Sequence, residues 1–507
     1  MLTPLKGDKQ VNSPQSPDPI DSSLSSKRDQ QTSSQLADPD DANVTLKSEP
    51  EKHLPQPAPD AAPADPEGPA AVSQAPEQDQ PIDLSKTSTT AVRVFQALLL
   101  IGGLGWAVAW SHWPQGFDYM QGPGFLIAMS ISWWLTPEIR ARALRLGLVD
   151  KPGEERRIHK VAVPRLGGVA IYISVIATVV GLVAICGRFP QEARGSEGGL
   201  AGIAVGGTLI FVLGLLDDLE SLPAKAKLLV QIVAGCVAYS LGVRIKHISI
   251  PATLMPQLMH LGSFFHLDLP KDGIFQLGPL SSVITVIWLV GIANAVNLID
   301  GMDGLAAGVS LISALTIWSV ALADGIDRPY AALAAAVLAG ALLGFLRWNF
   351  NPARIFLGDS GAYLVGFILG SISVMGVIKV VPAGTVIVPT FLLVLLILFF
   401  PILDTSWAIV RRVAKGKSPF EPDAGHIHHR LLRTGLSQKK VAYLIYGVSA
   451  LLGLIAAALV GQTLYFLCLA AAVLVMALFF SEVLNRHRQR QKKPNEIDPD
   501  DKGETAK

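Results

Sequence analysis

The chain has 507 residues, half of them hydrophobic, and its mean hydropathy of +0.41 is positive. A water-soluble protein of this length would rarely be so apolar, so the composition argues against a soluble globular class. The charge is nearly balanced, with 42 Lys and Arg against 41 Asp and Glu, and we expect no nucleic-acid partner.

Residues 1–90 contain no Phe, Trp or Tyr and are rich in Pro, Ser, Gln and Asp. A segment of this composition buries too little apolar surface to offset the entropy lost on ordering, so we predict a disordered tail. It also lacks the short apolar core of a secretory signal, so we expect no signal peptide there.

From residue 91 to 485, apolar stretches of near-membrane length alternate with polar loops, before a basic and then acidic tail at 486–507. A helix needs roughly twenty apolar residues to cross the hydrocarbon core, which predicts an all-α polytopic membrane protein with about twelve transmembrane helices. The stretches are residues 92–110, 121–137, 166–187, 200–216, 226–243, 279–297, 305–323, 330–347, 360–377, 382–402, 441–460 and 463–483.

Short loops rich in Lys and Arg lie on the cytoplasmic side of membrane proteins. The loops 138–165 and 403–440 and the tail 486–507 carry many such residues, whereas 111–120 carries none. We therefore predict that both termini are cytoplasmic and that the protein is multi-pass in the inner (plasma) membrane.

The unusual polar residues fall in loops that this orientation places together on the cytoplasmic face. These loops lie near residues 217–225, 298–304 and 348–359. A random scatter of polar loops would divide between the two faces, so the convergence predicts one site with cytoplasmic catalytic loops.

Asp217 and Asp218 are adjacent at the predicted cytoplasmic end of a span, with Lys225 and Lys227 downstream. Adjacent carboxylates near a membrane boundary are unfavourable unless a cation or a proton offsets their charge. The pair indicates either a functional site or a solvated pair that only ends a helix.

Four polar residues recur every three positions in the string NAVNLIDGMDGL, namely Asn294, Asn297, Asp300 and Asp303. On a helix this spacing places them along one stripe. Two amides and two carboxylates suit a hard cation together with a phosphate or a base edge. The alternative is a polar contact between helices inside the membrane.

The turn Gly358-Asp359-Ser360-Gly361 opens onto a predicted span. Backbone N–H groups at a helix N-terminus favour anions, although a simple loop turn is the alternative. A second glycine motif, Pro164-Arg165-Leu-Gly-Gly, opens another span after a basic cluster that membrane orientation explains in part.

His426, His428, His429 and Arg430 lie within five consecutive positions. These side chains could bind a transition metal, donate hydrogen bonds to a phosphate, or form a basic surface loop. We favour phosphate binding, because acidic residues elsewhere already offer a site for a hard metal.

The cysteines at 186, 236 and 468 show no metal or redox spacing, and we predict that they are buried packing residues.

Together these segments resemble the polyprenyl-phosphate N-acetylhexosamine-1-phosphate transferases of glycosyltransferase family 4, which include undecaprenyl-phosphate N-acetylglucosaminyl-1-phosphate transferase. The resemblance covers approximately residues 120–485. It is carried by PRLGG, LDDL with Lys227 and Gln231 after it, NAVNLIDGMDGL, GDSG and HIHHRLL. Asn351 departs from the family, in which many members have His, and the stretch 92–110 with the tail before it is additional to the usual plan.

The resemblance implies a reaction. An N-acetylhexosamine 1-phosphate, by default that of N-acetylglucosamine, passes from a UDP-sugar to undecaprenyl phosphate, and UMP is released. This would be the first membrane step of cell-envelope polysaccharide synthesis. It implies UDP-N-acetylhexosamine, undecaprenyl phosphate and the lipid bilayer as partners and Mg²⁺ as cofactor, with Mn²⁺ as a substitute, while a homodimer stays open.

The resemblance also implies roles for the motif residues. Asp217, Asp218 and Asp300 are expected catalytic groups, with Asp217 orienting or deprotonating the acceptor phosphate, and Asp303 is the expected metal ligand. Substrate binding is expected of Lys227, Asn294, Asn297, Asp359, His426, His428, His429 and Arg430.

Two other functions stay open. The muramoyl-pentapeptide-phosphate transferase of peptidoglycan synthesis is closely related, although HIHHRLL resembles the hexosamine branch more. A transporter would use the acids as proton or cation relays, but relays normally lie near mid-membrane, whereas these acids lie at span ends. The hexosamine, the downstream polysaccharide and a direct or covalent mechanism also stay open.

Overall fold

The computed structural model describes residues 89–112, 119–150, 163–186, 199–249, 255–264, 270, 274–323, 328–378, 390–416, 425–468, 470–471 and 474. The predicted N-terminal tail lies outside these residues except for Thr89 and Thr90, which open the first helix. The C-terminal tail 486–507 and most of the predicted stretch 463–483 also lie outside them.

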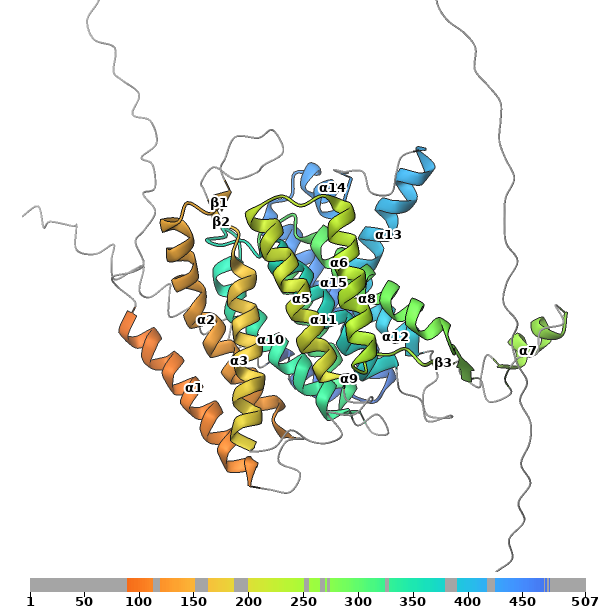
Figure 1. The fold of residues 1–507 in the computed structure, drawn as a ribbon, viewed down its shortest axis with the longest axis horizontal. Coiled ribbons are helices and arrows are strands. Elements are labelled where there is room, and N and C mark those ends of the chain that lie inside the picture. Colours follow the sequence, from red (N-terminus) through yellow and green to blue (C-terminus); the bar gives the residue numbers. More distant parts are fainter. Residues whose placement is uncertain are drawn as a thin grey trace, which may run out of the picture. The chain divides into compact units, whose positions relative to one another are not determined.

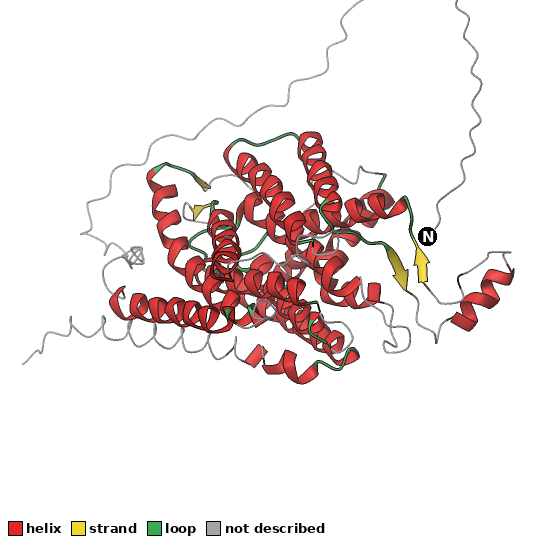
Figure 2. Ribbon diagram, turned by 60° about the horizontal axis from the view of Figure 1, so that its bottom comes forward, coloured by secondary structure: helices red, strands yellow, loops and turns green. Residues whose placement is uncertain are grey.

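The described residues are mainly helical, as Figures 1 and 2 show. In chain order the helices are α1 (Thr89–Ser111), α2 (Gln121–Arg145), α3 (Gly167–Cys186), α5 (Leu200–Leu219), α6 (Ala224–Ser240), α7 (Met255–Phe264), α8 (Leu280–Ile299), α9 (Leu305–Ala321), α10 (Pro329–Asn349), α11 (Gly358–Ser373) with the π-helical turn η2 (Val374–Ile378), α12 (Thr390–Ile397), α13 (Phe399–Ala414), α14 (Ile427–Arg433) and α15 (Gln438–Leu459).

Two short antiparallel strand pairs interrupt the helices. Strand β1 (Val149–Asp150) pairs with β2 (Val163–Pro164), and β3 (His247–Ser249) pairs with β4 (Ile274–Gln276). The sequence predicted an all-α protein, and strands of two or three residues are too short for an alternating pattern to reveal them. The β1–β2 pair matters for the site, because it leads directly into α3.

Within the described ranges, seven helices are long and apolar enough to cross a membrane, or up to eight if one bent pair counts as a span. They are α1, α3, α5, α8, α10, α11 with η2, and α15. The chain is therefore a largely helical, multi-pass membrane protein. Helices α2, α6 and α9 coincide with further predicted spans, but α6 and α9 have only 17 residues each.

The predicted stretch 382–402 is not one straight helix where the structure describes it. The chain bends by 89° between α12 and α13. Pro401 lies in the first turn of α13, where it cannot donate a hydrogen bond to the carbonyl of Ile397, so the helix breaks at Leu398. Helix α13 then runs on to Ala414, well beyond the predicted end.

Helix α11 is the central helix of the bundle. Its membrane-length segment is entirely buried, and it packs against α5, α8 and α3. By contrast, α1 lies at the edge of the bundle beside α2 and α3 (Figure 1), and little of it is buried. The enclosed helix α11 begins at Gly358, in the GDSG motif.

The cysteine prediction is wrong for two of the three residues. Cys236 and Cys468 are exposed on the protein surface, and Cys186 is half-buried. An apolar run in a membrane helix can face lipid as readily as it faces protein, since lipid tails are as apolar as leucine. Apolar sequence alone therefore did not distinguish the two environments.

Helices α2 and α10 approach each other through small residues. A Cβ atom on Gly340 would lie impossibly close to the carbonyl oxygen of Phe125, and one on Gly344 would collide with that of Met129. Glycines four residues apart share one helix face, so the two backbones can pack directly.

Gly344→Ala should therefore destabilise the bundle. The added methyl group forces the helices apart, which should cost about 1–3 kcal/mol of stability. Thermal unfolding of the purified variant in detergent should show a lower Tm. Gly447→Ala on α15 is the matched control, because a Cβ there meets nothing within 4 Å. Equal Tm values for Gly344→Ala and the wild type would contradict this packing.

Candidate functional site

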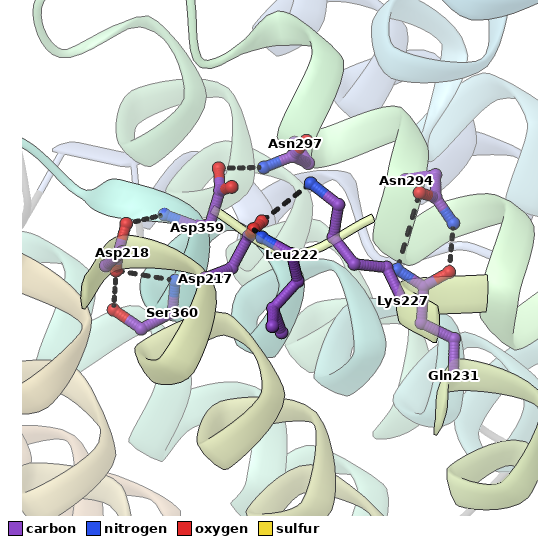
Figure 3. Close-up of polar contacts among 9 residues, drawn as sticks. All are labelled: Asp217, Asp218, Leu222, Lys227, Gln231, Asn294, Asn297, Asp359 and Ser360. Carbon is purple, nitrogen blue, oxygen red and sulfur yellow. Dashed lines mark hydrogen bonds and ion pairs between the residues drawn. The ribbon is translucent and has the colours of Figure 1, made fainter. Parts of the chain in front are cut away.

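The polar loops that the sequence placed on one face do meet. The C-terminal ends of α5 and α8 lie against the N-terminal ends of α6 and α11, and the motif side chains point toward one another there (Figure 3). Their hydrogen bonds join residues far apart in the chain, including Asp218 with Ser360 and Asn297 with Asp359.

Asp218 caps the N-terminus of α11 from the end of α5. Its Oδ1 accepts the backbone N–H of Asp359 at 2.8 Å, and its Oδ2 accepts the N–H and the hydroxyl of Ser360 at 3.0 and 2.6 Å. The first N–H groups of a helix have no partner within the helix, and a carboxylate also complements the helix dipole. Asp218 thereby fixes the position of Asp359.

Two glycine motifs allow this close approach. The N–H of Gly168 donates to the carbonyl of Leu357 at 2.9 Å, and a Cβ on Gly168 would collide with the backbone of Gly361. Gly358 has a φ of +73°, and a side chain there would strike the carbonyl of Arg165. The conformation and the space both require glycine, which explains the pairing of PRLGG with GDSG.

Asp217, next to Asp218 at the end of α5, is held by α6 and the loop before it. Its Oδ2 pairs with the ammonium of Lys227 at 2.7 Å, and its Oδ1 accepts the N–H of Leu222 at 2.8 Å. The Asp217 and Asp359 carboxyls lie close together in Figure 3, and Asn297 donates to Asp359 at 2.8 Å. Lys227 is the counter-charge, and its side chain stays 24% exposed.

Asn294 is engaged by the protein itself. Its Nδ2 donates to Gln231 Oε1 at 2.7 Å and to the carbonyl of Val290 at 2.8 Å. This is the polar contact between helices that was the alternative for the stripe, here joining α8 to α6. The Oδ1 of Asn294 also accepts a hydrogen bond from Gln231 Nε2 at 3.4 Å. A substrate role for Asn294 stays a prediction, and both N–H groups of its amide are already engaged by the protein.

Asp303 is held by one carboxylate oxygen only. Its Oδ2 accepts the Asn351 side-chain amide at 2.9 Å and the Ala353 N–H at 3.0 Å. Its buried Oδ1 has no hydrogen-bond partner among the residues that the structure describes. A buried carboxylate oxygen without a donor is costly, and a cation bound to Oδ1 would offset that cost.

Asp300 lies just beyond the end of α8, among the other acids. Burial and the nearby Asp359, Asp218 and Asp303 raise the pKa of Asp300 well above its ordinary value, and Arg165 opposes this only in part. The cluster is therefore short of positive charge, and a proton or a cation would stabilise it.

These residues fit a hard cation that is shared with substrate. No group of three or more His, Cys, Asp or Glu is arranged as a metal site in the described part of the chain. Mg²⁺ commonly uses only one or two carboxylates, and phosphate oxygens and waters complete its octahedron. The unpartnered oxygen of Asp303 and the acidic surroundings of Asp300 meet that requirement.

The histidine segment, residues 426–430, lies beside the segment that carries Asp300 and Asp303. A Cβ on Gly301 would be 2.6 Å from His428 Nε2, so the His428 ring covers this glycine. Both ring nitrogens of the buried His428 lack a partner in the described ranges. The ring centroid of His429 lies 4.4 Å from that of His428, with the two rings tilted by 40°, while Arg430 is exposed on α14.

His428 is neutral at pH 7. Burial, with His429 nearby, lowers the pKa of His428 to about 4, and burial lowers the pKa of His429 as well. A neutral imidazole still carries one N–H and can donate one hydrogen bond. His428 can therefore contact a phosphate oxygen, but it does not contribute a positive charge.

Sequence reasoning missed Asp404 of α13. Its Oδ2 lies 2.8 Å from His426 Nδ1, and its Oδ1 accepts the N–H of Ile427 at 2.7 Å. The available signal was a carboxylate within the apolar string FFPILDTSW, since acids inside membrane segments are costly and need partners.

Residues 200–377 match the family described as Glycosyl transferase family 4. The chain is 33% identical over 360 residues to a probable undecaprenyl-phosphate N-acetylglucosaminyl 1-phosphate transferase of Bacillus subtilis, covering 71% of this chain and 90% of that protein. It is 38% identical over 337 residues to a decaprenyl-phosphate N-acetylglucosaminephosphotransferase of Mycolicibacterium smegmatis, covering 63% of this chain and 77% of that protein. An undecaprenyl-phosphate alpha-N-acetylglucosaminyl 1-phosphate transferase of Thermotoga maritima is 30% identical over 356 residues, covering 70% of this chain and 96% of that protein.

Asp218→Asn should loosen the start of α11. The amide keeps the size of the side chain but turns an N–H toward a backbone donor, so at least one capping hydrogen bond is lost. The expected cost is about 1–3 kcal/mol, seen as a lower Tm. Glu220→Gln, an exposed position at the same helix end, is the control. A wild-type Tm for Asp218→Asn would exclude the capping role.

Proposed function

Because this chain belongs to glycosyl transferase family 4, we propose that it transfers N-acetylglucosamine 1-phosphate from UDP-N-acetylglucosamine to a polyprenyl phosphate and releases UMP. The relatives are named for this transfer to undecaprenyl or decaprenyl phosphate, which favours it over transfer of a muramoyl-pentapeptide phosphate and over transport. The observation that carries the proposal is the contact between an acidic cluster and a histidine segment at one end of the helices.

The net reaction is an exchange at one phosphorus atom. An acceptor phosphate oxygen forms a bond to the phosphorus that carries the sugar, and the bond from that phosphorus to the UMP oxygen breaks. UMP leaves with the electron pair. Both substrates are anions, so catalysis depends on positioning and charge compensation.

The α5 end of the site would handle the acceptor. Asp217 would orient or deprotonate the acceptor phosphate, and Lys227, its ion-pair partner at 2.7 Å, would attract the same anion. Asn297 would hold Asp359 in register, as its 2.8 Å hydrogen bond indicates. Asp218 would act indirectly, through the N-terminus of α11.

The α8 end would handle the donor diphosphate. Asp303, with Asp300 beside it, would hold Mg²⁺, or Mn²⁺ in its place. The ion would neutralise charge that develops on the diphosphate when it is bound. The neutral ring of His428, with His429 and Arg430, would donate hydrogen bonds to the phosphate oxygens from the opposite side.

Basic helix ends support a cytoplasmic placement of the site. Arg142 and Arg145 end α2, and Arg411 and Arg412 lie in the last turn of α13. We propose that this end faces the cytoplasm of the inner (plasma) membrane, where nucleotide sugars occur. The full plan of about twelve spans, with both termini cytoplasmic, belongs to the same proposal.

Purified protein should release UMP from UDP-N-acetylglucosamine only when undecaprenyl phosphate and Mg²⁺ are present. The protein is incubated with each of several UDP-N-acetylhexosamines and with UDP-muramoyl-pentapeptide, and the released UMP is measured by chromatography. Release of UMP only from the muramoyl donor would replace the proposed reaction with its relative. No UMP from any donor would refute transferase function.

Asp217→Asn and Asp303→Asn should both lower turnover, by on the order of a hundredfold or more, but with different metal dependence. Asp303→Asn removes a proposed Mg²⁺ ligand, so the Mg²⁺ concentration for half-maximal rate should rise. Asp217→Asn should leave it near the wild-type value. Mg²⁺ titrations of both variants would decide, and an identical shift in both would refute the division of roles.

A further inference from the structure

The carboxylate of Asp404 holds the histidine segment at two points. It is 1% exposed, and it lies on α13 just after the helix break. One oxygen is 2.8 Å from His426 Nδ1, and the other is 2.7 Å from the N–H of Ile427.

Each of these contacts fixes something specific. A carboxylate only accepts hydrogen bonds, so the Nδ1 of His426 must carry a proton, which leaves Nε2 as the nitrogen turned away from Asp404. The Ile427 N–H is the first donor of α14 and has no partner within that helix. One side chain therefore sets the orientation of a ring and the starting point of a helix.

The starting point of α14 determines where the other histidines lie. The rings of His426 and His428 are 5.7 Å apart and nearly parallel, at 12°, and the His428 ring covers Gly301 in the acidic segment. A shift of the first turn of α14 would move His428 and His429 away from this position.

We propose that Asp404 is a positioning residue for the transfer reaction. It acts through His426 and the N-terminus of α14 to hold the histidine segment against the diphosphate of the nucleotide-sugar donor. This inference rests on the proposed function, since the donor is the ligand that the segment would meet.

Asp404→Asn is the informative substitution, because it keeps the size of the side chain. An amide has one accepting oxygen, so it cannot accept from both His426 and Ile427. The kcat/KM for the UDP-sugar should fall roughly ten- to a hundredfold, chiefly through the donor KM, while the KM for polyprenyl phosphate stays unchanged. Thr405→Val is the matched control, since the neighbouring hydroxyl is buried without a partner in the described part of the chain.

A double-mutant cycle separates positioning from simple stabilisation. If Asp404 acts through His426, Asp404→Asn combined with His426→Ala should be no slower than His426→Ala alone. Multiplied losses, or wild-type donor kinetics in Asp404→Asn, would overturn the proposal. Equal losses in donor and acceptor KM would overturn it as well.

A measurement that does not depend on turnover tests the positioning role of Asp404 separately from the proposed function. Amide hydrogen exchange over residues 426–433 should be faster in Asp404→Asn than in the wild type and in Thr405→Val. If the wild type releases no UMP from any donor, the proposed function is refuted, and hydrogen exchange still tests whether Asp404 positions the histidine segment. Unchanged hydrogen exchange in Asp404→Asn would refute that positioning role.

Discussion

Crowding of carboxylates at one end of an apolar helix bundle is the constraint on which the rest of this structure depends. The acids are Asp217, Asp218, Asp300, Asp303 and Asp359. In a poorly solvated position each negative charge requires a hydrogen-bond donor, a cation or a proton. Among the described residues, hydrogen-bond donors contact four of these acids, and burial with the neighbouring acids raises the pKa of the fifth, Asp300, well above its ordinary value.

Each donor also has an architectural consequence. Asp218 takes its donors from the first turn of α11, which ties the central helix to the end of α5. Asp303 takes its donors from the loop after α10. The same contacts that stabilise the acids therefore join helices that are distant in sequence, and they leave one oxygen of Asp303 without a hydrogen-bond partner among the described residues.

The convergence of the polar loops could be predicted from the sequence because it follows from span lengths and from the distribution of Lys and Arg. The partners of individual side chains could not. The pairing of Asn294 with Gln231, and of Asp404 with His426, depends on which helix faces which, and periodicity carries no information about that. The bend at Leu398 was also not predicted, because the length of an apolar stretch does not reveal a local break in the helix. Pro401 was the available signal for that break.

Burial was the least predictable property. Cys236 lies in an apolar run and is exposed, whereas His428 lies in a segment predicted to be a polar loop and is buried and neutral. In a membrane protein the apolar surface can face lipid, and the polar site can be enclosed by protein. Composition predicts whether a segment can lie in the membrane, whereas the protonation state of a residue depends on the groups packed around it.

Binding of Mn²⁺ to the purified wild-type protein, followed by the EPR signal of the free ion, tests the central claim most directly. If the carboxylate cluster needs a cation that it shares with phosphate groups, Mn²⁺ should bind, and UDP should tighten that binding, because its phosphates supply ligands that the protein lacks. Absence of Mn²⁺ binding at millimolar concentrations, or binding that UDP leaves unchanged, would contradict the account.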